Sequence, residues 1–434
     1  MPTTHPDAPL YAGAAIPADP HAGAVRPAPL WAALVFSFLG SLGTGIVTTG
    51  IFFLSKHSYG FSDAENYLLG LVEGVTYIAG AIGAGPLLRR ARARFGLSAR
   101  AVLSLILLAL AASCLIPLLA AGTSGAGAKW AVWVLMIVYS PITGSLWPMV
   151  ESYISGGRSG PALRSAIGRF NITWSSALVL GFWVLGPLVE QHAVEAVVGV
   201  GAVHILSLLI LPWLGREPGR HLHDAHEPHP PEYRQLLVTF RVLLPMSYLV
   251  FMGLTPFLPG ILTRLDIPPG WQTPLTATWM ASRLVTFRLL ERWHGWHGRW
   301  YPALAGTALL LGGFAVAVLT PLLGNGTAPV AALLAGLCAF GVGMATIYAA
   351  ALYYAMEVGR AEVEAGGKHE ALIGLGYAGG PACGLAALAA AHSGLLRTDS
   401  VEPAVLMLVG GVGLVAGGVA AQRAWRAGQA GRDG

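Results

Sequence analysis

Long apolar segments separated by short polar ones run along nearly the whole chain of 434 residues. An α-helix needs about 20 predominantly apolar residues to cross a bilayer. Such segments fold as helices in lipid, because a helix satisfies all of its own backbone polar groups. The pattern predicts twelve spans, near residues 30–54, 64–88, 100–121, 130–155, 162–189, 193–214, 236–260, 271–290, 301–322, 329–356, 368–392 and 403–422.

The one long polar stretch, residues 215–235, divides these spans into two sets of six. The first 29 residues are rich in Pro, Ala and Gly and lack a basic segment followed by a cleavage site, which predicts a disordered cytoplasmic tail and no signal peptide. The predicted organisation is a tail (1–29), a six-helix bundle (30–214), a cytoplasmic linker (215–235), a second bundle (236–422) and a short cytoplasmic tail (423–434).

Composition supports the class of protein that the pattern indicates. The chain is 55% hydrophobic and 11% charged, whereas soluble domains are about 25% charged. An all-α polytopic membrane protein is therefore predicted. The cysteines Cys114, Cys338 and Cys383 each lie in an apolar run, as small core residues do. They predict neither a disulfide framework nor a metal cluster.

The positive charge is distributed unevenly along the chain. If the N-terminus is cytoplasmic, the opposite loops hold only Lys56, Lys129, Arg264 and Arg397, and the other 22 of the 26 basic residues lie on or near the cytoplasmic side. Because basic residues favour cytoplasmic loops, this asymmetry predicts twelve spans with both termini in the cytoplasm. The net charge of +5 thus needs no nucleic-acid partner. The chain uses Arg far more than Lys and is rich in Gly and Ala, which is typical of a GC-rich bacterial genome. The predicted location is therefore a bacterial inner membrane.

Internal similarity indicates a duplication. Residues 177–187 read ALVLGFWVLGP and residues 371–381 read ALIGLGYAGGP, at an offset of 194. Weaker matches in the same order predict two parallel six-helix repeats, related by an axis along the membrane normal. These matches are 87–96 with 289–298, and Trp147…Tyr153 with Tyr348…Tyr354.

Six plus six spans, cytoplasmic termini, a polar central loop and basic loops after helices 2 and 8 resemble the major facilitator superfamily over residues 30–422. GPLLRRARARFG (85–96) stands where that family keeps a Gly-x-Leu-x-Asp-Arg-x-Gly-Arg motif, and Gly186-Pro187 resembles its Gly-Pro signature in helix 5. Arg89 occupies the place of the motif's Asp, which puts the gating contact of that Asp in question. The gating-loop candidates are Gly85, Arg89, Arg90 and Arg92.

Ionisable residues inside the predicted spans are candidate functional residues, because charges in a membrane are costly. Glu73 lies in helix 2 between apolar residues, and Arg283 lies in helix 8. Glu73 is predicted either to carry a coupling proton or substrate contact, or to be a structural partner of a buried group. Arg283 must face a cavity, an acid or backbone carbonyls, and an anionic or substrate contact is one hypothesis for it.

Aromatic residues crowd helices 4 and 10. Trp147 and Glu151 are four residues apart on one face of helix 4, and helix 10 carries Tyr348 and Tyr353. The resemblance implies that helices 1, 4, 7 and 10 line a central cavity, so these residues are expected to contact an organic solute there. Ordinary helix packing is one alternative, and for Glu151 an ion pair with Arg89 or Arg90 as part of a gate is another.

Polar residues also open helices 5 and 11 on the cytoplasmic side. Arg169 and Asn171 enter helix 5, and His369 and Glu370 occupy the corresponding depth in helix 11. A His–Glu pair inside a cavity is a candidate proton site, whereas near the interface it is merely solvated. The linker has histidines at 221, 223, 226 and 229, which the Pro-rich context favours as a solvated segment over a metal site.

The leading hypothesis is a secondary transporter that acts by alternating access, as the resemblance implies. Its partners are a small-molecule solute and the lipid bilayer, and protons could couple through Glu73 or Glu370. The alternative is a membrane enzyme or scaffold built on the same bundle, but no catalytic cluster is found. The chain has no Gly-x-x-x-x-Gly-Lys phosphate loop. We expect a monomer without cofactor or metal.

Overall fold

The computed structural model describes residues 27–120, 122, 125–158, 160–219, 230–358, 363–393 and 400–430. Within this part of the chain the regular structure is helical and contains no strand. The four linker histidines and Arg397, which the sequence analysis considered, lie outside the described residues.

Two series of six helical segments follow one another. The first consists of α1 (Leu30–Thr48) with α2 (Ile51–Ser58), α3 (Asp63–Phe95), α4 (Ala99–Ser113) with η1 (Ile116–Ala120), α5 (Lys129–Ser155) preceded by η2 (Gly125–Ala128), α6 (Gly160–Leu185) with η3 (Gly186–Leu188), and α7 (Ala193–Leu208) with η4 (Leu211–Trp213).

The second series begins after the linker. It consists of α8 (Pro231–Leu254) with α9 (Leu258–Arg264), α10 (Pro269–Arg292), α11 (Tyr301–Leu319) with η5 (Thr320–Leu323), α12 (Thr327–Val358), α13 (Val363–His392), and α14 (Glu402–Val405) with η6 (Leu406–Gly410) and α15 (Gly411–Ala430).

Among the described residues, 11 helices are long and apolar enough to cross a membrane. The remaining predicted span, 271–290, corresponds to α10, which has 24 residues and is long enough but more polar. Several of its polar side chains, among them Gln272, Thr276 and Arg283, are buried inside the protein. This burial explains why hydropathy alone does not select α10, and its crossing stays a prediction.

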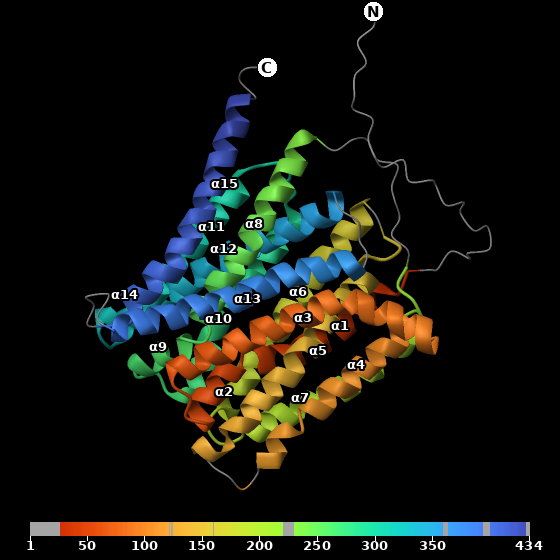
Figure 1. Ribbon diagram of the computed structural model, residues 1–434. Coiled ribbons are helices and arrows are strands. Elements are labelled where there is room, and N and C mark those ends of the chain that lie inside the picture. Colours follow the sequence, from red (N-terminus) through yellow and green to blue (C-terminus); the bar gives the residue numbers. More distant parts are fainter. Residues whose placement is uncertain are drawn as a thin grey trace, which may run out of the picture.

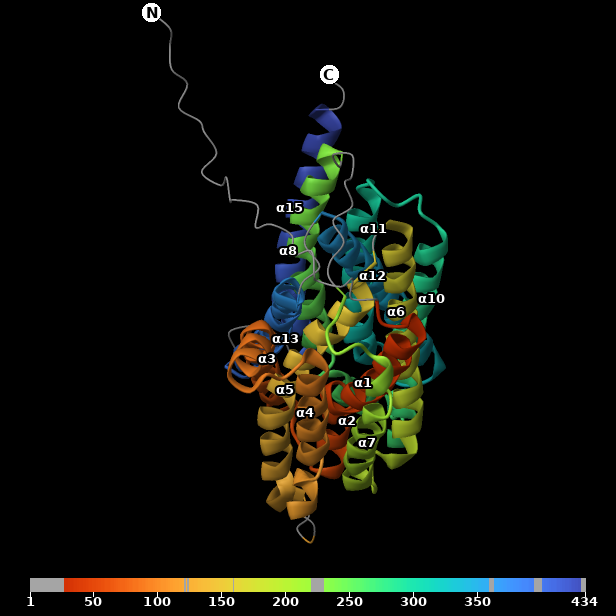
Figure 2. The same cartoon turned by 90° about the vertical axis from the view of Figure 1, so that its right-hand side faces the viewer.

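The helix contacts of the first series recur in the second. The pairs α1–α6, α3–α5 and α4–α7 correspond in chain order to α8–α13, α10–α12 and α11–α15. The two series meet mainly along α3 with α13 and α6 with α10, which lie on opposite sides of the molecule in Figure 2, and α5 also packs against α13. We call the helices α1–α7 the first half and α8–α15 the second half.

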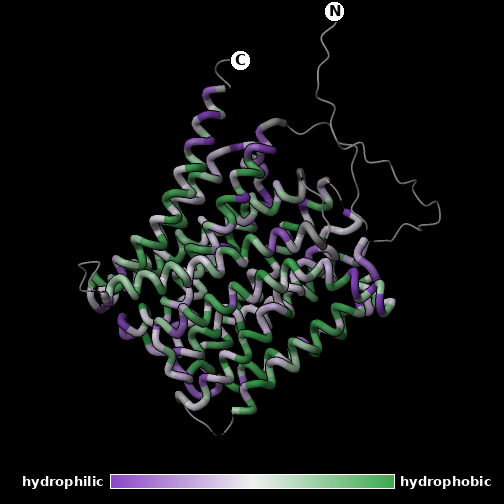
Figure 3. The backbone as a smooth tube through the Cα atoms, viewed as in Figure 1, coloured by the Kyte–Doolittle hydropathy of each residue, from purple (hydrophilic) through white to green (hydrophobic). Residues whose placement is uncertain are grey.

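Hydrogen bonds join the halves at the end that carries α2 and α9. Arg264 bonds Asp63 at 3.4 Å, His57 and Gln272 lie 2.8 Å apart, and the Tyr67 hydroxyl donates to the Gly253 carbonyl at 2.8 Å. We call this the α2–α9 end. In Figure 1, α8 and α15 rise steeply away from this end, whereas α4 runs to the right. Figure 3 shows polar positions gathered at the helix ends and apolar ones between them.

Glycines allow close approach at both contacts between the halves. A Cβ added at Gly74 would lie 2.2 Å from the amide nitrogen of Ala378, and one at Gly186 would lie 2.5 Å from the carbonyl oxygen of Gly270. Neither position can therefore hold a larger residue unless the backbones separate.

The two Gly-Pro steps of the internal repeat are not equivalent in packing. Gly186 meets α10 of the other half, whereas a Cβ at Gly380 would lie 2.3 Å from the carbonyl oxygen of Leu249 in α8, within its own half. From the second step, only Pro381 reaches the other half, at Gly70. In the first copy of the repeated sequence, the glycine of the Gly-Pro step packs between the halves. In the second copy, the equivalent glycine packs within its own half.

Candidate functional site

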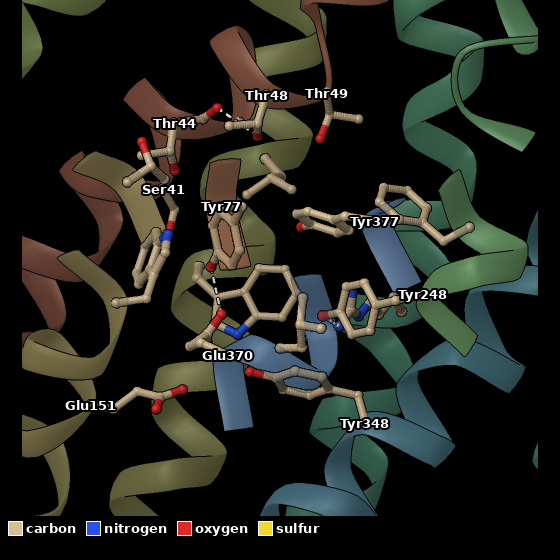
Figure 4. A pocket seen from close by; sticks show the side chains of 18 of the residues that line it. Ser41, Thr44, Thr48, Thr49, Tyr77, Glu151, Tyr248, Tyr348, Glu370 and Tyr377 are labelled. Carbon is tan, nitrogen blue, oxygen red and sulfur yellow. Dashed lines mark hydrogen bonds between the residues drawn. The ribbon is translucent and has the colours of Figure 1, made fainter. Parts of the chain in front are cut away.

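A cavity of about 90 Å³ lies between the halves, and Figure 4 shows the side chains around it. The first half lines it from α1, α3, α5 and α6, and the second half from α8, α10, α12 and α13. We call it the central cavity. A row of hydroxyls from α1 and the residue that follows it faces this cavity, at Ser41, Thr44, Thr48 and Thr49.

An acidic cluster crosses the boundary between the halves in this cavity. Glu370 of α13 accepts a hydrogen bond of 2.5 Å from the hydroxyl of Tyr77 in α3. Glu151 of α5 lines the same cavity, and α5 packs against α13. Both glutamates are buried. Two ionised carboxylates buried in one small cavity would repel each other, so the cluster favours at least one bound proton.

Glu73 lies one helical turn before Tyr77 but does not line the central cavity. Its side chain is buried, and its Oε2 has no hydrogen-bond partner among the described residues. The hydroxyl of Ser140 donates to its backbone carbonyl at 2.7 Å. A charge at such a place is costly unless it is paired. Glu73 is therefore a buried acid at the packing of α3 with α5.

Arg283 of α10 is 2% exposed and lies in an aromatic cage. The carbon of its guanidinium is 4.3 Å from the ring centroid of Trp174 and 4.9 Å from that of Tyr348. Phe287 and Trp279 lie at 5.3 and 5.9 Å. Such contacts stabilise a cation by about 0.5–2 kcal/mol each, depending on solvent exposure.

Three of these rings pack against one another beside the central cavity. Trp174 of α6 lies 5.8 Å from Phe287 and 5.7 Å from Tyr348, and the last two rings are 6.0 Å apart. We call Trp174, Phe287 and Tyr348 the aromatic triad. It joins the first half to the second, because α6 belongs to one half and α10 and α12 belong to the other.

A second cavity of about 510 Å³ lies on the side of the triad away from the α2–α9 end. We call it the vestibule. Asn171, Phe287, Glu291, His297 and Tyr353 are among the residues that line it. Since Phe287 belongs to both the triad and the vestibule wall, the triad stands between the vestibule and the central cavity.

The predicted site residues fall into three groups. In the central cavity are Trp147, Glu151, Arg283, Tyr348 and Glu370. In the vestibule are Asn171, which accepts a hydrogen bond of 3.2 Å from Trp174, and Tyr353. Outside both are Glu73, Arg169 and His369.

Arg169 and His369 lie near the starts of α6 and α13 and face neither cavity. Arg169 is exposed on α6. His369 packs edge-on against Tyr348 at 6.0 Å, and its Nε2 has no partner among the described residues. Glu370 lines the central cavity and accepts a bond from Tyr77, whereas His369 does not line it, so the two do not form the predicted His–Glu pair inside the cavity.

The gating-loop candidates are helical. Gly85, Arg89, Arg90 and Arg92 belong to the last turns of α3, which continues to Phe95. Arg92 forms an ion pair with Glu217, which also accepts a bond of 3.3 Å from the backbone of Ala99. This contact ties the end of α3 to the start of α4 and to the segment that follows η4.

Sequence reasoning missed several residues of the site. Tyr77, Tyr248 and Tyr377 line the central cavity, as do Trp279 and the hydroxyls of α1. One signal was present, since Ser41, Thr44 and Thr48 recur at helical spacing on an otherwise apolar helix. The tyrosines carry no such signal, because buried tyrosines are common at helix contacts.

Two helical halves around a shared, mixed polar and aromatic cavity are typical of membrane transporters. A sequence model described as Major Facilitator Superfamily matches residues 34–381. The chain belongs to this family. No curated protein matches the sequence significantly.

Solved structures of transporters share the fold. The nucleoside transporter NupG matches with a TM-score of 0.59 and 13% identity, over 91% of this chain and 98% of its own. The human organic anion transporter MFSD10 matches with 0.60 and 15%, over 90% and 99%. The proton:xylose symporter XylE matches with 0.61 and 14%, over 89% and 94%. At these identities the likeness concerns the fold alone.

Proposed function

We propose that this protein is a proton-coupled secondary transporter, which carries a small organic solute by alternating access of the central cavity. Both halves line that cavity, so relative movement of the halves changes its access. The bonds at the α2–α9 end and the vestibule at the other end support a state that opens on one side only. With the predicted orientation, the vestibule faces the cytoplasm of a bacterial cell.

The pair of Glu151 and Glu370 carries the proposal. These glutamates belong to different halves and line the same small cavity. Loss of the last proton from the pair leaves two like charges there, which repel strongly where water is scarce. Protonation therefore favours an arrangement in which α5 and α13 stay together, and deprotonation favours their separation. A proton gradient can thus bias the cycle.

The fold neighbours support coupling only by analogy, because one of them is titled a proton:xylose symporter. We assign the proton to the pair of glutamates and not to Glu73, since Glu73 does not line the central cavity. We expect the protein to act as a monomer, in which the linker 215–235 joins the halves at 30–214 and 236–422.

The test compares two buried acids on the same scaffold. Purified protein in liposomes is screened with labelled nucleosides, sugars and carboxylates for uptake that an inward proton gradient drives. We expect E370Q to lose gradient-driven accumulation while it retains exchange of labelled for unlabelled solute, because the amide cannot cycle a proton. E73Q should retain both activities.

Exchange provides the control for folding, since it needs an intact cavity and both conformations but no net proton movement. If E370Q accumulates solute like the wild type while E73Q does not, the coupling site is Glu73 and the assignment is wrong. If the wild type moves none of the solutes under any gradient, the proposed function itself fails.

A further inference from the structure

Arg283 has no acidic partner among the described residues, although it is 2% exposed. Its only described hydrogen bond is a long one of 3.4 Å, from Nη2 to the hydroxyl of Tyr248. Its Nε is buried and has no partner in the described part of the chain. A guanidinium has five donors in a fixed planar fork. Most of the hydrogen-bonding capacity of Arg283 is thus unused.

Packing alone does not explain this arginine. Four aromatic rings stabilise its charge but accept no conventional hydrogen bond from it. An unpaired buried donor is costly, and such a residue in the wall of a cavity is a candidate binding group. Arg283 lines the central cavity, so a bound group there can reach it.

We infer that Arg283 binds the carboxylate of a small organic anion, and that this anion is the solute; the inference rests on the proposed function. A carboxylate offers two coplanar oxygens, which match the guanidinium fork with two parallel hydrogen bonds. The surrounding rings of Trp174, Trp279 and Tyr348 provide apolar surface for the carbon part of the anion.

The remaining cavity wall fits this class of ligand. The hydroxyls of Ser41 and Thr44 can donate to further oxygens of the anion, whereas that of Thr48 already donates to the Thr44 carbonyl at 2.8 Å. The cavity holds about 90 Å³ in this conformation, well below the several hundred Å³ that drug-sized ligands occupy. A short organic acid therefore fits better than a large one.

Proton coupling and anion binding also support each other. Figure 4 shows Glu370 and Glu151 facing the cavity beside the hydroxyl of Tyr348, whose ring contacts Arg283. An ionised glutamate pair would repel an anion, whereas a protonated pair carries less charge. Binding of the anion and binding of the proton should therefore favour each other, as reciprocal linkage requires.

The test measures equilibrium binding in detergent, without any gradient. Acetate is compared with acetamide and benzoate with benzamide, because each amide has the shape of its acid without the charge. Nitrate and chloride are the inorganic probes. We expect saturable quenching of tryptophan fluorescence by at least one carboxylate and none by its amide, since Trp174 contacts the Arg283 guanidinium.

Variants assign the effect to the arginine. R283Q should weaken carboxylate binding about 10- to 100-fold, as expected for the loss of a charge-assisted pair. R283K keeps the charge but loses the fork, and should bind more weakly than the wild type. R288Q is the matched control, because Arg288 lies on the same helix, is more exposed and bonds Glu291 at 2.5 Å.

Y248F keeps the proposal testable if the arginine variants do not fold. It removes the only described hydrogen bond of Arg283 and leaves the charge, so benzoate or acetate affinity should change about 2- to 5-fold. Absence of carboxylate binding by the folded wild type would overturn the inference. The inference would also be overturned if R283Q bound carboxylates as tightly as the wild type does, or if nitrate quenched the fluorescence as strongly as carboxylates do.

The two proposals fail separately. If carboxylate binding depends on Arg283 but uptake does not depend on protons, the anion site is supported and proton coupling is contradicted. If protons drive uptake of a neutral solute and R283Q does not affect that uptake, the proposed transporter function is supported and the anion site is contradicted.

Discussion

At the scale of single residues, the rim of the vestibule contains a histidine held in its neutral form. His297 stacks on Tyr353 with ring centroids 4.1 Å apart and an interplanar angle of 4°. Burial, followed by the positive charges of His294 and Arg164, lowers the pKa of His297 to about 4. The ring is therefore neutral near pH 7, and protonation would add a positive charge close to Arg164 of α6.

Acidification should destabilise the folded protein through His297. Its pKa of about 4 in the folded state is below the value of about 6.5 in an unfolded chain. The unfolded chain thus binds more protons in this interval, so the contribution to stability is present above about pH 6.5 and is lost as the pH falls toward 4. After allowance for partial exposure, we expect a loss of about 1–2 kcal/mol.

Melting temperatures between pH 7.5 and 4.5 check this expectation. H297F keeps an aromatic ring against Tyr353 but cannot titrate, so its melting temperature should fall less than that of the wild type. H392F, which removes an exposed histidine from the last turn of α13, should behave like the wild type. Parallel curves for H297F and the wild type would contradict the assignment.

At the scale of helices, glycine sets how closely the halves approach. Gly186 and Gly380 occupy equivalent places in the repeated sequence, but Gly186 faces Gly270 and Pro274 of the other half while Gly380 faces α8 of its own. Contacts within a half persist when the halves move, whereas contacts between halves must form and break. The same substitution should therefore have different consequences at the two positions.

G186A should slow transport more than it weakens binding, because its methyl group would lie 2.5 Å from the carbonyl oxygen of Gly270 and would hold α6 away from α10. G380A should instead lower the melting temperature by overpacking against α8, which typically costs about 1–3 kcal/mol. Exchange rates, affinities and melting curves separate the two effects. G312A is the control, since a Cβ there meets nothing within 4 Å.

The order and type of the helices could be predicted from sequence, because apolar runs of sufficient length have few alternatives in lipid. Even the polar helix α10 was found, as the span 271–290. The acidic cluster could be predicted only in part. Glu151 and Glu370 were candidates, but their pairing depends on the register of α5 against α13, and the register of α3 decides that Tyr77 and not Glu73 reaches Glu370. No local pattern encodes these registers.

At the scale of the whole molecule, a small charge network closes the α2–α9 end. Asp63 accepts from Lys56 of its own half at 2.9 Å and from Arg264 of the other half at 3.4 Å. Arg264 also bonds Glu402 at 3.0 Å. Among the described ion pairs, the bridge from Asp63 to Arg264 is the one that crosses between the halves at this end. It must break when the cavity opens there.

Weakening this bridge should shift the protein toward a state that opens at the α2–α9 end. D63N removes the charge that Arg264 contacts. A partly exposed ion pair contributes about 0–1 kcal/mol, so the population of the open state should rise up to about fivefold. A single cysteine at Thr48, in the wall of the central cavity, placed on a background without Cys114, Cys338 and Cys383, reports the change.

An impermeant thiol reagent added to intact cells should label this cysteine faster in D63N than in the parent, because the predicted topology puts the α2–α9 end outside. D266N is the matched control, since Asp266 lies at the same end but bonds Asn325 of its own half. Equal labelling rates in D63N and D266N would show that the bridge does not hold this end closed. Faster labelling of the parent from the outside than from the inside would show instead that the vestibule opens outward and that the predicted orientation is reversed.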